Sequence, residues 1–201
     1  MSQDFFRAPI TSMTPNQRAR RERLTGAVIA IVSETGPENL QMREVAERSG
    51  VALGTAYRYF ASKEHLLAAA WADWHGRLTE KVMADLARPD RRQITERVLD
   101  FALRQMRAFQ HNPNFARLAV QVEASSDPYA SETLVQIGEE NQRVMEALMS
   151  GLPPEIARPA RIAISSTLGA GLISWSTGRA TIMDTLRNLE DVVRLVLRET
   201  G

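Results

Sequence analysis

The sequence predicts an all-α protein of about nine helices, and three observations favour this fold class. No alternation of apolar and polar residues persists for more than a few positions, which argues against strands. Signals for helix starts and stops recur along the chain, with prolines and glycines between segments of helical periodicity. The 201 residues are 44% hydrophobic and 24% charged, so the chain can bury a substantial core and form one domain or two small ones.

The first predicted helix begins at Pro15. Thr14 supplies an N-cap, Pro15 occupies the first helical position, and Gln17 completes a capping box. Gly36, followed by proline, ends the helix. Its apolar stripe consists of Leu24, Val28, Ile31 and Val32.

Two short helices are expected next, at about residues 42–48 and 52–59, joined by a turn centred on Gly50. Ser62 can cap a fourth helix, which runs toward a break at residues 88–90. The sequence Arg-Pro-Asp at this break makes it the candidate domain boundary.

Four or five longer helices are expected beyond the break, at about residues 91–110, 113–124, 128–149, 154–177 and 181–198. The uncharged run Ile162–Gly178 approaches the minimum of roughly 17 residues that a membrane span needs. It carries six serines and threonines, so we expect a buried helix and no membrane partner.

The two short helices and their glycine turn predict a helix-turn-helix, whose second helix enters a DNA major groove. At about 100° per residue, Ala56 and Phe60 lie within about 40° of each other and define its buried side. Gly54, Thr55 and Arg58 lie on the opposite side. Aromatic clusters at helical spacing are usually core, but burying two tyrosines and an arginine on divergent faces of so short a helix is less plausible.

The exposed face offers distinct kinds of DNA contact. Tyr57 and Tyr59 fall on the two flanks, where their hydroxyls could reach phosphates. Gly54 allows the helix backbone to approach closely, and Arg58 could donate two hydrogen bonds to a guanine edge. Leu53, at the helix start, could meet a thymine methyl group.

A second set of cations lies near the start of the first helix, where arginines occupy positions 18, 20, 21 and 23. Cations in the first turns oppose the helix dipole, so an anionic partner would explain Arg18 and Arg20. A solvated charged face is the alternative, and taken alone it explains them about equally well. Lys63 can hold a further phosphate. Because the net charge is only +1, DNA binding must come from such local clusters.

The stretch Leu40–Leu67 resembles the DNA-binding signature of the TetR family of bacterial transcriptional regulators. The shared features, at fixed spacings, are Ala46, Gly50, Gly54-Thr55, Tyr57-x-Tyr59-Phe60 and Ser62-Lys63. The resemblance covers roughly residues 15–68. It implies phosphate or base contacts for Gln41 or Met42, Leu53, Thr55, Tyr57, Tyr59 and Lys63. Leu53 departs from the family, which often has lysine or another polar residue there, so an operator sequence cannot be transferred.

A looser similarity extends to repressors of steroid and cholesterol catabolism in actinobacteria. It rests on the stretches Gly50–Phe60 and Ser62–Ala70, on a late tryptophan, and on Arg179-Ala180 before the last helix. With the family resemblance, three regions are expected. These are a disordered arm at 1–14, a DNA-binding domain at 15–62, and a ligand-binding and dimerisation domain at 63–201.

The last two helices suggest a dimer interface. An apolar seam of period 3.5 is suited to helix pairing and consists of Ile182, Leu186, Leu189, Val193 and Val196. The preceding helix offers small residues that allow close approach, among them Ser166, Gly169 and Ala170. An ordinary core helix is the alternative. We expect a two-fold four-helix interface, as the family resemblance implies.

The middle helices carry candidates for an effector pocket, although most of them are expected to be core. They are Phe101, Gln105, Met106, Phe109, Phe115, Leu118, Val122, Asn141, Met145 and Trp175. The family resemblance implies a large apolar cavity, in which Gln105 and Asn141 would orient a bulky hydrophobic ligand.

The sequence therefore predicts a repressor that binds palindromic double-stranded DNA as a homodimer and is released by a small hydrophobic effector. A bundle enzyme is one alternative, but the chain has no cysteine, no His-Glu-x-x-His motif, no Walker loop and no nucleophile elbow. None of its three histidines follows a glutamate by three residues, as di-metal bundles require. A helical adaptor is the other alternative. No catalytic residue, metal or cofactor is expected, and without a secretory signal the expected location is the cytoplasm.

Overall fold

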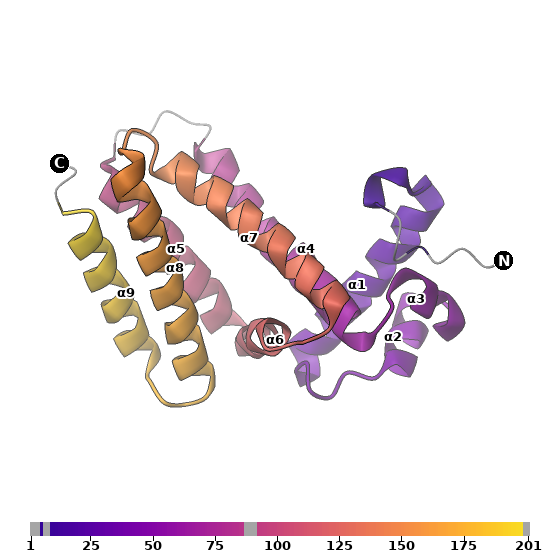
Figure 1. The fold of residues 1–201 in the computed structure, drawn as a ribbon. Helices are drawn as coiled ribbons and strands as arrows, with labels where there is room; N and C mark the ends of the chain where they lie inside the picture. Colours follow the sequence, from indigo (N-terminus) through magenta and orange to yellow (C-terminus); the bar gives the residue numbers. More distant parts are fainter. Residues whose placement is uncertain (1–4, 6–8, 87–91, 199–201) are drawn as a thin grey trace. The chain divides into compact units, whose positions relative to one another are not determined.

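The computed structural model describes residues 5, 9–86 and 92–198, which form helices joined by short loops (Figure 1). The chain divides into two compact units. Unit 1 comprises Met1–His75 and Arg117–Gln136, and unit 2 comprises Gly76–Ala116 and Ile137–Gly201. The predicted all-α class is confirmed for the described residues, in which no strand occurs.

Unit 1 contains the predicted helix-turn-helix. Its N-terminal elements are η2 (Ile10–Ser12), α1 (Pro15–Thr35), α2 (Met42–Ser49) and α3 (Leu53–Tyr59). The unit also includes parts of three longer helices, α4 (Lys63–Leu86), α6 (Pro113–Glu123) and α7 (Pro128–Leu148). Helix α1 packs on α2, and α2 packs on α3. The predicted stripe of α1 is fully buried at Leu24, Val28, Ile31 and Val32.

Local capping explains where α1 begins and ends. The Thr14 N–H donates to Gln17 Oε1 at 2.7 Å, and the Gln17 N–H donates to Thr14 Oγ1 at 3.3 Å. This is the predicted capping box, and such caps contribute about 1 kcal/mol. At the other end Gly36 adopts a φ of +84°, which a residue with a Cβ rarely tolerates.

The turn between α2 and α3 has the left-handed geometry that a helix-turn-helix needs. Gly50 has a φ of +64°, and the Val51 N–H donates to the Ala46 carbonyl at 3.2 Å. An ion pair of 2.7 Å between Arg48 and Glu34 joins α2 to α1. Ser62 begins α4 as predicted, because its Oγ accepts the His65 N–H at 2.9 Å.

Unit 2 is built around α5 (Ile94–His111), α8 (Pro154–Ser176) and α9 (Ile182–Val196). Helices α8 and α9 run side by side in opposite directions, and α5 packs against both (Figure 1). A Cβ on Gly171 of α8 would lie 2.6 Å from Thr185 Cγ2 of α9. Glycine at this position therefore allows the close approach of the pair. Thr181 and Asp184 form a second capping box at the start of α9.

The uncharged run in α8 is not a buried helix, so that expectation was wrong. Ala160, Ile164 and Leu172 face the interior, whereas Ile162 and Ile173 are exposed. One side of α8 packs on the rest of unit 2 and the other side does not. None of the described helices combines the length and apolar character that crossing a membrane would require.

Two expectations fall wholly or partly outside the described residues. The predicted break at 88–90 lies entirely outside them, and α5 begins at Ile94 rather than at residue 91. Of the predicted arm, residues 1–4 and 6–8 also lie outside them. The boundary at residue 62 between a DNA-binding domain and a ligand-binding and dimerisation domain remains a prediction.

Candidate nucleic-acid interface

Helix α3 presents one side away from the core of unit 1. Ala56 and Phe60 are fully buried, as expected. Gly54 is exposed, and Tyr57 has 45% of its surface accessible. Leu53, Thr55 and Arg58 are half-buried. The side with Gly54, Thr55 and Arg58 is therefore the accessible one, and the backbone at Gly54 is open because a Cβ there would meet nothing within 4 Å.

Tyr59 does not fit its predicted role and is a correction to the sequence analysis. It is 1% exposed, and its hydroxyl is buried without a hydrogen-bond partner among the described residues. The Phe5 ring lies 5.0 Å from the Tyr59 ring, centroid to centroid. One flank of α3 is thus covered by a residue from the chain's first segment, and Tyr59 cannot offer its hydroxyl to a phosphate in this conformation.

Phe5 also contacts the predicted base-reading residue. The Arg58 guanidinium carbon lies 4.8 Å from the centroid of the Phe5 ring, a cation–π geometry. The sequence pattern did not predict a role for Phe5. The available signal was a pair of adjacent aromatic residues, at positions 5 and 6, in an otherwise weakly apolar start.

The arginines of α1 separate into two groups. Arg18 and Arg20 are exposed and form no ion pair within the described part of the chain. Arg21 is half-buried, and its guanidinium carbon lies 5.0 Å from the Phe60 ring centroid. Burial lowers the pKa of Arg21, although Asp73 and Glu22 oppose that shift. Arg21 thus helps to pack unit 1, while Arg18 and Arg20 remain available to an anionic partner.

The other predicted DNA contacts lie at helix starts. Gln41 is exposed at the N-cap of α2, and its side chain makes no capping hydrogen bond. Met42 and Lys63 are half-buried at the first positions of α2 and α4. Free N–H groups at helix starts attract phosphate, so these positions suit backbone contacts.

His65 is a buried residue at the start of α4 for which no role was predicted from the sequence. Its ring is stacked on Tyr129 at 5.4 Å and meets the Phe60 ring edge-on at 5.2 Å. The Ala61 N–H donates to His65 Nδ1 at 3.3 Å. Burial, together with the charge of Arg21, lowers the pKa of His65 to about 4, although Asp127 opposes this shift. The neutral ring therefore packs between the helix-turn-helix and the start of α7.

The predicted effector residues are mostly buried. Phe101, Gln105, Met106, Phe109, Phe115 and Met145 are buried in unit 2, Leu118 and Val122 are buried in unit 1, and Asn141 and Trp175 are half-buried in unit 2. Oδ1 of Asn141 is inaccessible and has no hydrogen-bond partner among the described residues.

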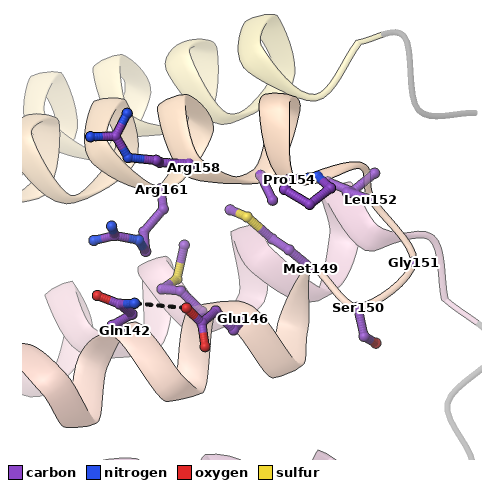
Figure 2. A pocket seen from close by; sticks show the side chains of 11 residues that line it. Gln142, Glu146, Met149, Ser150, Gly151, Leu152, Pro154, Arg158 and Arg161 are labelled. Carbon is purple, nitrogen blue, oxygen red and sulfur yellow. Dashed lines mark hydrogen bonds between the residues drawn. The ribbon is translucent and has the colours of Figure 1, made fainter.

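A cavity of about 510 Å³ lies elsewhere in unit 2, at the end of α7 and the start of α8 (Figure 2). Met145 is the one predicted effector residue among those that line it. Its other lining residues were not predicted from the sequence, and they include Met149, Arg158 and Arg161.

The predicted dimer seam is also corrected in part. Leu189 and Val193 are fully buried within unit 2, where α9 packs on α5 and α8, so they cannot meet a partner chain. Ile182, Leu186 and Val196 are half-buried. The small residues Ser166, Gly169 and Ala170 of α8 are exposed, as a close helix contact would need.

Comparisons with known proteins agree with this arrangement. Residues 27–70 match the family model described as bacterial regulatory proteins, tetR family. The transcriptional repressor KstR of Rhodococcus jostii (strain RHA1) is 34% identical over 183 residues, which cover 90% of this chain and 84% of that protein. The chain belongs to the TetR family. KstR of Mycolicibacterium smegmatis is 35% identical over 187 residues, with coverages of 90% and 88%.

Solved structures of transcriptional regulators share the fold. A TetR transcriptional regulator from Rhodococcus sp. RHA1 superposes with a TM-score of 0.75 at 28% identity, covering 92% of this chain and 98% of that one. FadR from Bacillus subtilis, in complex with stearoyl-CoA, superposes with a TM-score of 0.66 at 19% identity, with coverages of 87% and 96%.

The family settles two sequence-based expectations. The chain is a DNA-binding transcriptional regulator and not an enzyme, because its relatives are transcriptional repressors of the TetR family. The resemblance to the steroid-catabolism repressors is confirmed by the KstR relatives.

Proposed function

We propose that this TetR-family protein is a repressor that binds a palindromic operator as a homodimer and is released by a bulky hydrophobic effector. The observation that carries the proposal is the orientation of α3. Ala56 and Phe60 anchor the helix in the core, while Gly54, Thr55 and Arg58 remain on the accessible side. Recognition helices of this motif read base edges from that side.

The residues on and around α3 make two kinds of DNA contact, to base edges and to phosphates. Arg58 donates to a guanine edge after its side chain leaves the Phe5 ring, a contact that costs about 0.5 to 1 kcal/mol to give up at an exposed site. Leu53 and Thr55 lie beside it on the same helix. Phosphate contacts are assigned to Arg18, Arg20, Gln41, Met42, Tyr57 and Lys63. Tyr59 is excluded from this set because its side chain is buried.

The homodimer uses the accessible side of α8. Ile162, Ser166, Gly169 and Ile173 lie within about 60° of one another around the helix axis. All four are exposed, and a Cβ on Gly169 would meet nothing within 4 Å of its own chain. Two isoleucines with small residues between them suit close packing on a second α8. This stripe replaces the buried positions Leu189 and Val193 as the proposed interface.

The effector acts by preferring one of two conformations. Helix α4 contributes Lys63–His75 to unit 1 and Gly76–Leu86 to unit 2, so it links the DNA-binding residues to the other unit covalently. An effector that binds one conformation of this helix better than the other shifts the population toward it. The FadR that shares the fold is in complex with stearoyl-CoA, whose acyl chain is apolar, and this supports an effector with a large apolar part.

Selection of bound sequences from a random DNA pool tests the proposal. The full-length protein should recover a palindrome with two half-sites, and the Arg58→Ala variant should recover a less defined one. Repeating the selection with candidate sterols and acyl thioesters should reduce recovery for the true effector class. Recovery of no preferred sequence by the folded protein would contradict the assignment of α3.

A further inference from the structure

The cavity in unit 2 has an apolar floor. Its volume of about 510 Å³ lies within the usual range for small-molecule sites, which is roughly 300 to 1,000 Å³. Met145 lines its base from α7, and Met149 lines it from the turn just after that helix. Both side chains are buried, and half-buried Leu152 continues the apolar surface into the loop before α8. Methionine side chains adapt to irregular apolar groups, so this floor suits a flexible hydrocarbon.

The opposite wall is cationic. Ala157, Arg158 and Arg161 line the cavity from one face of α8, and in Figure 2 the Arg161 side chain reaches toward Gln142 and Glu146 of α7. Arg158 and Arg161 form no ion pair with any described residue. Arg104 of α5, by contrast, pairs with Asp85 at 2.7 Å and with Asp100 at 2.9 Å.

The carboxylate in the cavity does not neutralise these arginines. Glu146 lines the cavity and accepts a hydrogen bond from Gln142 Nε2 at 2.8 Å (Figure 2). Two guanidinium groups against one carboxylate leave a net charge of +1 on the lining. A guanidinium beside an apolar floor binds carboxylate or phosphate oxygens through two charge-assisted hydrogen bonds.

We propose that this cavity binds an amphipathic anion, a molecule with a flexible apolar chain and one terminal carboxylate or phosphate group. The chain lies on Met145, Met149 and Leu152, and the anionic group is held by Arg161 with Arg158 at the rim. This inference rests on the proposed function, because it gives the chemical class of the effector that releases DNA.

Calorimetric titration of the full-length protein tests the ligand class. The probes are dodecanoate, dodecyl phosphate, the uncharged dodecanol and inorganic phosphate. Binding of either chain-bearing anion, with dodecanol at least tenfold weaker and inorganic phosphate undetected, supports the inference and shows which anionic group is preferred. Equal affinity for dodecanol, or failure of both chain-bearing anions to bind, would overturn it.

Variants locate the binding site. Arg161→Gln should weaken binding of the anion at least tenfold and leave dodecanol binding unchanged. Arg143→Gln, on α7 and outside the cavity lining, is the matched control and should bind like the parent protein. Ala157→Phe should fill the cavity and reduce binding of both probes. An Arg161→Gln variant that folds and binds the anion as tightly as Arg143→Gln would place the site elsewhere.

DNA binding by the same preparations separates this inference from the proposed function. A protein that binds a selected operator but neither anion retains the proposed function and loses the inference. A protein that binds the anion through Arg161 but no duplex loses the proposed function alone. If both bind, the anion should release DNA from the parent and not from Arg161→Gln, and an anion that binds without releasing DNA would refute the effector assignment.

Discussion

At the scale of single residues, Arg58 and Lys63 carry positive charge at two different places in unit 1. Replacing each of them by alanine should therefore affect DNA binding differently. Arg58→Ala should remove the proposed base contact, worth about 1 to 3 kcal/mol, and relax the preference at one operator position. Lys63→Ala should weaken binding to all sequences about equally. Affinity measured on the operator and on its single-base variants distinguishes the two. Uniform losses on every sequence for both variants would refute this division of roles.

Gly54 offers a way to separate folding from binding. Alanine at this position meets no atom within 4 Å and should leave the free energy of unfolding unchanged or raise it by up to about 1 kcal/mol. DNA affinity should nevertheless fall, because the added methyl group separates the α3 backbone from the groove. Thermal unfolding and DNA titration provide the two readouts. Gly26→Ala, also free of contacts, is the control and should not change DNA affinity.

His65 should make stability depend on pH. Its pKa in the folded protein is about 4, below the ordinary value of 6.5, so the unfolded chain binds the extra proton first. The contribution is complete above about pH 6.5 and is lost as the pH falls toward 4. The loss should be about 1 to 3 kcal/mol. Chemical unfolding between pH 7 and 4.5 measures it, and His65→Gln should flatten the profile in this range; an unchanged profile would exclude His65 as the cause.

The burial of single residues could be predicted from the sequence where it depends on their position on one helix. Ala56 and Phe60 are buried because both lie on the side of α3 that its own turn directs inward. Tyr57 and Tyr59 are symmetric about that direction, and the sequence could not distinguish them. The ring contact of Tyr59 with Phe5 joins residues far apart in sequence, so no local pattern could predict it.

At the scale of elements, helix ends could be predicted within about three residues because caps are local. Thr14, Gly36, Gly50 and Ser62 each act on groups within a few positions of themselves. The faces of the long helices could not be assigned in the same way. The seam of α9 has the period of a pairing helix, but only the packing of α5 and α8 decides that Leu189 and Val193 serve the protomer's own core.

The contact between α8 and α9 leads to a prediction about two nearby glycines. Gly171→Ala would bring a Cβ to 2.6 Å from Thr185 Cγ2, and such overpacking should cost about 1 to 3 kcal/mol. Thermal unfolding should show a lower midpoint for this variant, partly restored by adding Thr185→Ser. Gly169→Ala is the control, because its Cβ meets no atom within 4 Å and should not lower the protomer's stability. Equal effects at both positions would contradict the packing described for α8 and α9.

At the scale of the whole molecule, the net charge of +1 means that any attraction to DNA is local. Arg18, Arg20 and Lys63 in each of two protomers would neutralise about six phosphates, giving a slope of about −5 for log affinity against log salt concentration. DNA titration across a salt series measures this slope. Replacing Arg18 and Arg20 by glutamine should reduce its magnitude, and a flat salt dependence would contradict the phosphate contacts proposed for these residues.

The ion pair between Arg48 and Glu34 has a consequence for regulation. Arg48 also pairs with Glu44 at 2.7 Å, one turn earlier on α2. One guanidinium therefore binds carboxylates of both α2 and the end of α1. The ion pair with Glu34 is partly exposed and adds at most about 1 kcal/mol to the packing of α1 on α2, and the two together hold the helix-turn-helix as one unit. In the proposed homodimer, an inducer would then change the separation of the two helix-turn-helix motifs along the duplex more than the shape of either motif.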